Sequence, residues 1–326
     1  MASKPKVAFY WCASCGGCEE AVVDLAEAVL DVVSAVDIVF WPVALDFKVA
    51  DVEALPDGAI TASFINGAVR LSEQEEMARL LRRKSKFVIA FGSCSHMGGV
   101  PGLANLWDRK SIFAWYYHDA PSVAVDGGAE PQETVRVPEG TLTLPAFWDT
   151  VKPLDAVIDV DYYLPGCPPT PKLIANAVGA LLSGNLPPRG AVLAGTRALC
   201  HECRLNATKP EKLLLKDLKR VHQVTVDPEK CLLAQGVLCL GPVTRGGCEA
   251  LCVAGNMPCT GCFGPTDEVR DQGAKGIAFL SSVVDFDAQE EIERALGNVP
   301  DPVGTFYRYS LPRSYLVRKR GVPSHG

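Results

Sequence analysis

Cysteines in short, closely spaced groups constrain this chain more than any other feature of its sequence. The chain has 13 cysteines in 326 residues, and eight of them lie between Cys200 and Cys262. The N-terminus shows neither a long apolar leader nor a twin-arginine pair, so we expect a cytoplasmic protein. In a reducing compartment, such cysteines indicate metal ligands rather than disulfides.

The first half of the chain alternates short apolar runs with amphipathic segments. Strands are predicted over residues 7–11, 36–45, 59–64, 86–91 and 156–163, and helices over residues 19–36, 72–83, 103–112 and 171–182. Residues 119–153 are polar and rich in turn formers, which indicates an insertion. The alternation predicts an α/β fold with a doubly wound, mostly parallel sheet and helices on both faces.

The composition changes at residues 183–190, which predict a linker between two domains. We place the domains at residues 1–184 and 185–326. The second has few long periodic segments, so we expect a smaller, irregular domain that folds around cofactors. The chain ends in a basic segment that is expected to be a solvated charged end, with a docking tail as the alternative; its cations are Arg308, Arg313, Arg318, Lys319 and Arg320.

Five cysteines of the first half follow predicted strands. The carboxyl ends of parallel strands meet at one edge of a sheet, so three strand ends can gather four thiolates. Sulfur ligands and a C-x-x-C turn are typical of a [4Fe-4S] cluster site. The neighbouring glycine and proline residues are small enough to let backbone amides approach the sulfides of the cluster. The expected ligands are Cys15, Cys18, Cys94 and Cys167. Cys12 is left over and is expected to be a buried, spare thiol.

The eight later cysteines divide naturally into two sets of four, although their spacing alone does not fix the division. We expect one cluster on Cys200, Cys203, Cys231 and Cys239, and another on Cys248, Cys252, Cys259 and Cys262. Structural zinc would also satisfy these eight cysteines, and the Cys15/Cys18 pair alone is compatible with a thiol redox pair.

Charge and hydropathy exclude other classes of protein. A net charge of -6 and a pI near 5.5 argue against binding to nucleic acid. No stretch of about 18 apolar residues is present, so no transmembrane segment is expected. Nucleotide-binding and serine-hydrolase motifs are also absent from the sequence.

Three motifs resemble the proximal-cluster motifs of [NiFe]-hydrogenase small subunits. They are Tyr10-Trp-Cys-Ala-Ser-Cys-Gly-Gly-Cys-Glu-Glu20, Phe91-Gly-Ser-Cys-Ser-His-Met-Gly-Gly-Val-Pro-Gly102 and Leu164-Pro-Gly-Cys-Pro-Pro-Thr170. Residues 41–46, residues 64–77 and the end of the cysteine series are most similar to the gamma subunit of the cytoplasmic methyl-viologen-reducing hydrogenase, the type associated with heterodisulfide reductase. The resemblance covers almost the whole chain.

This resemblance implies a flavodoxin-like first domain whose proximal cluster faces a large subunit with a nickel-iron centre. The chain would relay electrons from H2 oxidation and hold no catalytic residue. Its cofactors would be three [4Fe-4S] clusters, with Cys15, Cys18, Cys94 and Cys167 proximal, the set from Cys248 to Cys262 medial, and the set from Cys200 to Cys239 distal. The implied partners are the large subunit, an iron-sulfur adaptor subunit and subunits like heterodisulfide reductase.

The chain departs from many periplasmic relatives, which have His at the position of Cys200 and no cysteine at that of Cys252. All-thiolate sites carry more negative charge, which lowers their reduction potential. Two alternatives remain: a quinone-oxidoreductase subunit with one terminal cluster, and a zinc-stabilised interaction module. The first class has adjacent cysteines in the first loop and lacks the eight downstream cysteines.

Overall fold

A five-stranded parallel sheet forms the centre of the first half in the computed structural model, which describes residues 4–124 and 130–315. The strand order is β2-β1-β3-β5-β9, and every neighbouring pair is parallel. The strands are β1 (Lys6–Trp11), β2 (Asp37–Phe40), β3 (Ile60–Asn66), β5 (Ser85–Phe91) and β9 (Tyr162–Leu164). When the five strands are renumbered in chain order within this sheet, their order becomes 2-1-3-4-5, which is the order of flavodoxin-like folds. The predicted fold class is therefore confirmed.

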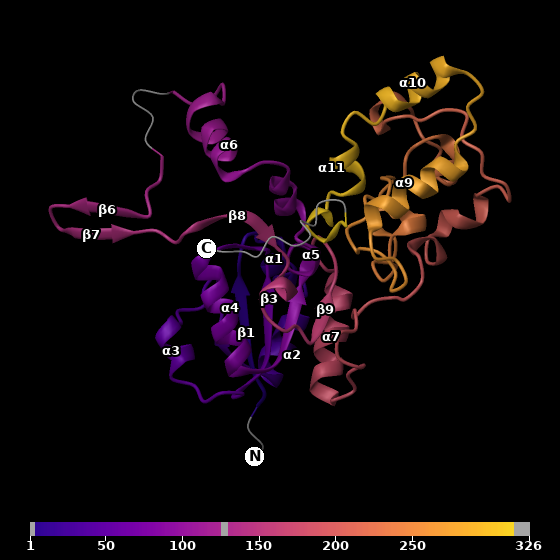
Figure 1. The fold of residues 1–326 in the computed structure, drawn as a ribbon. Helices are drawn as coiled ribbons and strands as arrows, with labels where there is room; N and C mark the ends of the chain where they lie inside the picture. The colour runs from indigo at the N-terminus through magenta and orange to yellow at the C-terminus, as the bar shows by residue number, and fades with distance from the viewer. Residues whose placement is uncertain (1–3, 125–129, 316–326) are drawn as a thin grey trace.

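Helices cover both faces of the sheet, as Figure 1 shows. On one face α1 (Gly17–Val23), α2 (Ala28–Ala35) and α7 (Pro171–Ser183) pack against side chains such as Phe9 and Phe64. On the other face α3 (Val49–Glu53) and α4 (Ser72–Lys84) pack against Ala8 and Val88. Because the central strands are buried on both sides, they appear in the sequence as continuous apolar runs.

Four predicted elements differ from the structure. The helix predicted over residues 103–112 is divided into a 3-10 helix, η1 (Val100–Leu106), and α6 (Arg109–Ala114), because Trp107 and Asp108 between them have an extended backbone. The helix predicted over residues 19–36 is divided into α1 and α2, because Ala26 has a φ of 52° and interrupts the helical backbone. The strand predicted over residues 36–45 ends at Phe40, and a turn through Pro42 follows. The strand predicted over residues 156–163 is reduced to β9, which follows a 3-10 turn, η3 (Leu154–Ala156).

The described part of the predicted insertion, residues 119–124 and 130–153, follows a helical segment and forms an arm that projects from the sheet (Figure 1). After a 3-10 helix η1 (Val100–Leu106), the chain forms α6 (Arg109–Ala114) and a π-helical turn, η2 (Trp115–Asp119). Farther along, β6 (Thr134–Val137) and β7 (Gly140–Thr143) make a hairpin, and β8 (Phe147–Lys152) pairs antiparallel with β4 (Val69–Leu71). Figure 1 shows the hairpin standing away from the sheet.

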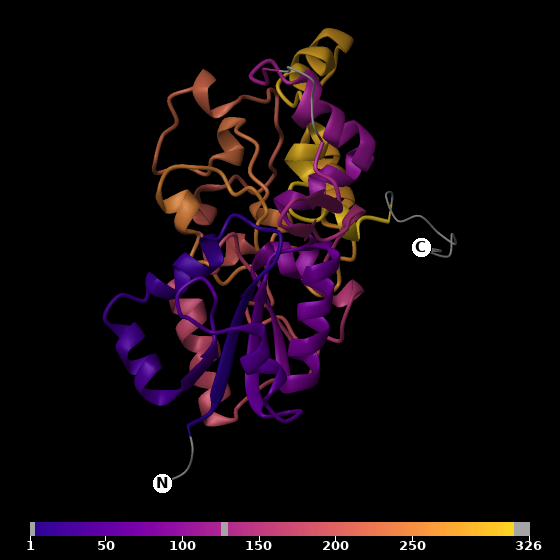
Figure 2. The ribbon, with the colours of Figure 1, turned by 90° about the vertical axis from the view of Figure 1, so that its left-hand side faces the viewer.

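The second half stands on the carboxyl edge of the sheet in both ribbon views (Figures 1 and 2). It has little regular structure before residue 272, as predicted, and most of its short helical elements there are 3-10 turns. These turns are η4 (Leu199–His201), η5 (Arg204–Thr208), η6 (Val221–Gln223), η7 (Leu233–Gln235) and η8 (Gly241–Val243). The helices are α8 (Leu251–Ala254), α9 (Gln272–Val283), α10 (Gln289–Gly297) and α11 (Pro302–Phe306), followed by the turn η9 (Leu311–Arg313).

The end of the chain returns to the first half. Arg313 Nε donates to the backbone oxygen of His96 at 2.7 Å, and the backbone N–H of Gly99 donates to the backbone oxygen of Tyr309 at 3.0 Å. The predicted boundary at residues 184/185 therefore separates segments that remain in contact. Arg318, Lys319 and Arg320 lie outside the described residues. Among the helices of the described residues, none has the length and apolar character needed to cross a bilayer.

Candidate metal centres

Four cysteines meet at the carboxyl edge of the sheet, because each follows the end of a strand or sits in the helix after it. Cys15 and Cys18 follow β1, Cys94 lies in α5 (Gly92–Met97) directly after β5, and Cys167 lies between β9 and α7. Burial raises the pKa of Cys18, and the nearby thiolates of the other three raise it further. We call these four residues the edge group.

Glycines at the edge group leave room for its sulfur atoms. A Cβ on Gly92 would overlap the Cys18 sulfur, and a Cβ on Gly99 would overlap the Cys94 sulfur. Both glycines have positive φ values, 85° and 59°, which side chains other than glycine rarely adopt. These two positions therefore need glycine for backbone conformation and for sulfur packing.

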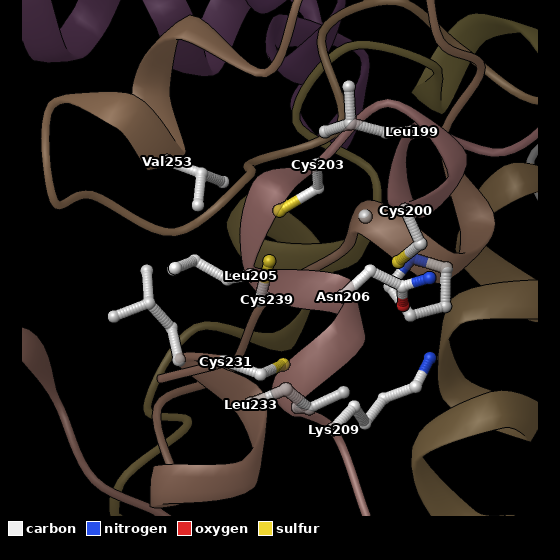
Figure 3. A pocket seen from close by; sticks show the side chains of 13 residues that line it. Leu199, Cys200, Cys203, Leu205, Asn206, Lys209, Cys231, Leu233, Cys239 and Val253 are labelled. Atoms are coloured by element: carbon white, nitrogen blue, oxygen red, sulfur yellow. The ribbon is translucent and has the colours of Figure 1, made fainter. Parts of the chain in front are cut away.

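A second group lines a single pocket, which Figure 3 shows from close by. Apolar side chains such as Leu199, Leu205 and Val253 form its walls. Its cysteines are Cys200, Cys203, Cys231 and Cys239. Burial raises the pKa of Cys200 to about 11; the Lys209 cation opposes this rise, and the other three thiolates add to it. We call these four residues the pocket group.

The remaining four cysteines form a middle group: Cys248, Cys252, Cys259 and Cys262. Burial raises the pKa of Cys262 to about 12, with contributions from the thiolates of Cys248 and Cys252. The pKa of Cys259 is raised by burial and by the nearby thiolates of Cys239 and Cys262. The structure thus brings each of the twelve predicted ligands near other members of its own set.

Hydrogen bonds connect the middle group to the other two. The backbone N–H of Cys259 donates to the Cys239 sulfur at 3.3 Å, which joins the middle group to the pocket group. The backbone N–H of Cys167 donates to the Cys262 sulfur, which joins the middle group to the edge group. The spatial order is therefore edge group, middle group, pocket group.

Cys12 stands apart from these groups. It is 5% exposed and packs in the core between the sheet and α4, among residues such as Ala8 and Ile65. Burial alone raises its pKa, and no other cysteine contributes to the rise. The prediction of a buried thiol is confirmed, and the structure gives it no cysteine partner among the described residues.

The chemistry of the three groups fits iron-sulfur clusters. Each provides four soft sulfur donors, and backbone N–H groups point at several of them. The N–H of Val100 donates to Cys94, that of Gly241 to Cys239 and that of Gly261 to Cys259. Such bonds stabilise the negative charge of thiolates bound to iron. Within residues 4–124 and 130–315, no three His, Cys, Asp or Glu side chains are arranged to hold a single metal ion.

Three polar residues that the sequence analysis did not single out support the cysteine loops. The Glu202 carboxylate accepts from the backbone N–H groups of Gly247, at 2.9 Å, and of Cys248, at 3.2 Å. Thr244 bonds the Cys259 thiol through its side chain, and Ser93 bonds the backbone oxygen of Cys262. Only Glu202, between Cys200 and Cys203, had a sequence signal, namely a charged side chain inside a C-x-x-C turn.

The first half of the chain matches a known family. Residues 15–181 match the family model described as NADH ubiquinone oxidoreductase, 20 Kd subunit. The fold also resembles a chain from the [NiFeSe]-hydrogenase of Dm. baculatum, with a TM-score of 0.52 and 16% identity over 81% of this chain and 95% of that chain. The family match places the first half of the chain among proteins related to this oxidoreductase subunit, and the structural match shows that the fold is shared.

Relatives that match both halves of the chain identify its family more closely. The chain is 41% identical to the iron-sulfur G subunit of the F420-non-reducing hydrogenase of Archaeoglobus profundus, over 96% of this chain and 98% of that protein. It is 37% identical to the corresponding G subunit from Methanothermobacter thermautotrophicus, over 98% of both. The chain belongs to the family of F420-non-reducing hydrogenase G subunits. The prediction of a hydrogenase subunit is confirmed, whereas the gamma designation stays a prediction.

Proposed function

We propose that this chain is the electron-transfer small subunit of a cytoplasmic [NiFe]-hydrogenase. H2 would be split at the nickel-iron centre of a large subunit into two protons and two electrons, and only the electrons would pass through this chain. The observation that carries the proposal is the end-to-end contact of three groups of four cysteines through Cys167–Cys262 and Cys259–Cys239.

The three groups would hold three [4Fe-4S] clusters. The edge group would be proximal, the middle group medial and the pocket group distal. The order of the two bridging contacts supports this assignment, because the middle group touches both of the others. Within each group the cysteines would be the iron ligands, while the N–H donors of Val100, Gly241 and Gly261 would stabilise the thiolate charge.

The acceptor would be a low-potential partner of the heterodisulfide-reductase type, reached through an iron-sulfur adaptor subunit. The relatives are named F420-non-reducing hydrogenases, which supports an acceptor other than F420. The assignment to the gamma subunit of the methyl-viologen-reducing type belongs to the same proposal. All-thiolate ligation in every group favours the low potentials that such a route needs.

Anaerobic purification with the native partners tests the proposal. Three cubes predict about 12 Fe per chain, with an equal amount of acid-labile sulfide. A larger, nickel-containing chain should co-purify, and EPR should show reduced iron-sulfur signals that appear under H2. Iron near four per chain would reject the clusters of the second half, and zinc in place of iron would favour the interaction module.

A quinone-linked subunit is the second candidate, because the matched family model carries the description of a ubiquinone oxidoreductase subunit. That model covers residues 15–181 only and leaves out the middle and pocket groups. Four Fe per chain, no nickel-containing partner and reduction of quinone would support this candidate.

A further inference from the structure

Ser93 lies where the loops of the edge group and the middle group meet. It is 1% exposed and directly precedes Cys94 in the first turn of α5. Its backbone N–H donates to the backbone oxygen of Gly166 at 2.7 Å, next to Cys167. This bond satisfies one of the N–H groups that the start of a helix leaves without a partner.

The Ser93 hydroxyl connects the edge group to the middle group. It lies within hydrogen-bond distance of two backbone oxygens, those of Gly166 (2.8 Å) and Cys262. A hydroxyl carries one proton, and the Gly166 oxygen already accepts the Ser93 N–H. The hydroxyl donates to one of the two oxygens at a time, and the Gly166 oxygen keeps the Ser93 N–H as a donor when the hydroxyl donates to Cys262. The sulfur of Cys262 accepts the backbone N–H of Cys167.

We propose that Ser93 is a positioning residue that fixes the separation and orientation of the edge group and the middle group. It acts on the clusters through Cys262 and Gly166 and is not itself a ligand. This inference rests on the proposed function, because it assumes that both groups hold clusters. Removing the hydroxyl leaves the Cys262 oxygen without this donor and lets the Cys262 loop shift relative to Cys167.

The test compares Ser93→Ala, Ser93→Thr and the control Ser63→Ala in the anaerobically purified complex. Ser63 is 0% exposed, and its hydroxyl bonds that of Ser85 at 2.7 Å inside the sheet. The control thus deletes a buried hydroxyl that contacts no cysteine loop. The readouts are iron content, the potentials of the clusters and the magnetic coupling between neighbouring reduced clusters in EPR.

We expect Ser93→Ala to keep the full iron content and to change the EPR coupling, with Ser93→Thr and Ser63→Ala close to wild type. Loss of about four Fe in Ser93→Ala alone would also support the proposal, because one cluster would then depend on the hydroxyl for its retention.

Unchanged coupling and potentials in Ser93→Ala would overturn the proposal for Ser93 and leave the proposed function intact. Equal changes in Ser93→Ala and Ser93→Thr would overturn it too, since side-chain shape rather than the hydroxyl would matter. Wild-type protein without iron would overturn both proposals.

Discussion

The backbone N–H of Cys259 lies 3.3 Å from the Cys239 sulfur and donates a hydrogen bond to it. The bond crosses between the two sets into which the last eight cysteines divide. Sequence spacing does not fix that division, and each set could exchange a member with the other. The division therefore needs a test of its own.

Pairs of substitutions test the division. Cys200→Ser and Cys231→Ser should each remove about four Fe, and the double variant should also remove about four, because both residues line one pocket. Cys231→Ser combined with Cys252→Ser should remove about eight Fe, since the two residues belong to different groups. Iron analysis of the anaerobic protein gives the answer. A loss near eight in the Cys200/Cys231 pair would show that our division is wrong.

The ligand role of Cys94 can be separated from the packing role of Cys12. Cys94→Ser should remove about four Fe and stop H2-dependent reduction of the acceptor, because the edge group is the entry point of the proposed relay. Cys12→Ala should keep iron and activity, since Cys12 lies in an apolar core away from the other cysteines. Iron content and H2-dependent dye reduction are the measurements. Similar losses in the two variants would contradict the assignment of Cys12 as a spare thiol.

Gly92 offers a test that does not remove a ligand. Gly92→Ala should displace the Cys18 sulfur and deplete the cluster of the edge group by about four Fe, because the added methyl group overlaps that sulfur. Gly190→Ala is the matched control: its φ is 87°, close to the 85° of Gly92, but no atom lies within 4 Å of its added Cβ. Both variants carry the strain of a positive φ, on the order of 1 kcal/mol. Equal iron contents in the two variants would show that contact of the added methyl group with the Cys18 sulfur does not decide whether the cluster is held.

Removal of the clusters should unfold part of the second half and spare the sheet. Residues 195–265 have few regular backbone hydrogen bonds, and their core includes Cys239 and Cys259. A segment of this kind depends on its metal for stability, as small metal-binding domains do. After oxidative removal of iron, hydrogen exchange should become fast there and stay slow in β1, β3 and β5. Slow exchange in both regions would contradict this dependence.

The central strands β1, β3 and β5 were predictable because they are largely buried and each is followed directly by a cysteine or a glycine. The predictions for β1, β3, α4, β5 and α7 agree with the structure to within about two residues at each end. The break between α1 and α2 was not predictable, because residues 24–27 continue the apolar periodicity of the helix. Alanine has a high helix propensity, so local preference does not account for the positive φ of Ala26.

The convergence of the edge-group cysteines was predictable from the sequence, whereas the residues that support the cysteine loops were not. Cysteines at strand ends must converge in a parallel sheet, so Cys15, Cys94 and Cys167 could be grouped from the sequence. The contact of Cys259 with Cys239 joins residues 20 apart through an irregular backbone, for which no periodic pattern exists. Ser93 reaches Cys262 across 169 residues, and nothing near it in the sequence indicates that contact.

Three of the thirteen cysteines, Cys15, Cys167 and Cys252, are exposed in this chain. Accessible thiols are the ones that oxidise to sulfenic and higher acids, and such a change at any of these positions would remove a sulfur donor from one of the proposed clusters. The time the chain spends unassembled in air would therefore set how much of it can still be reconstituted. Work on the isolated chain calls for an inert atmosphere and an added reductant from cell lysis onward.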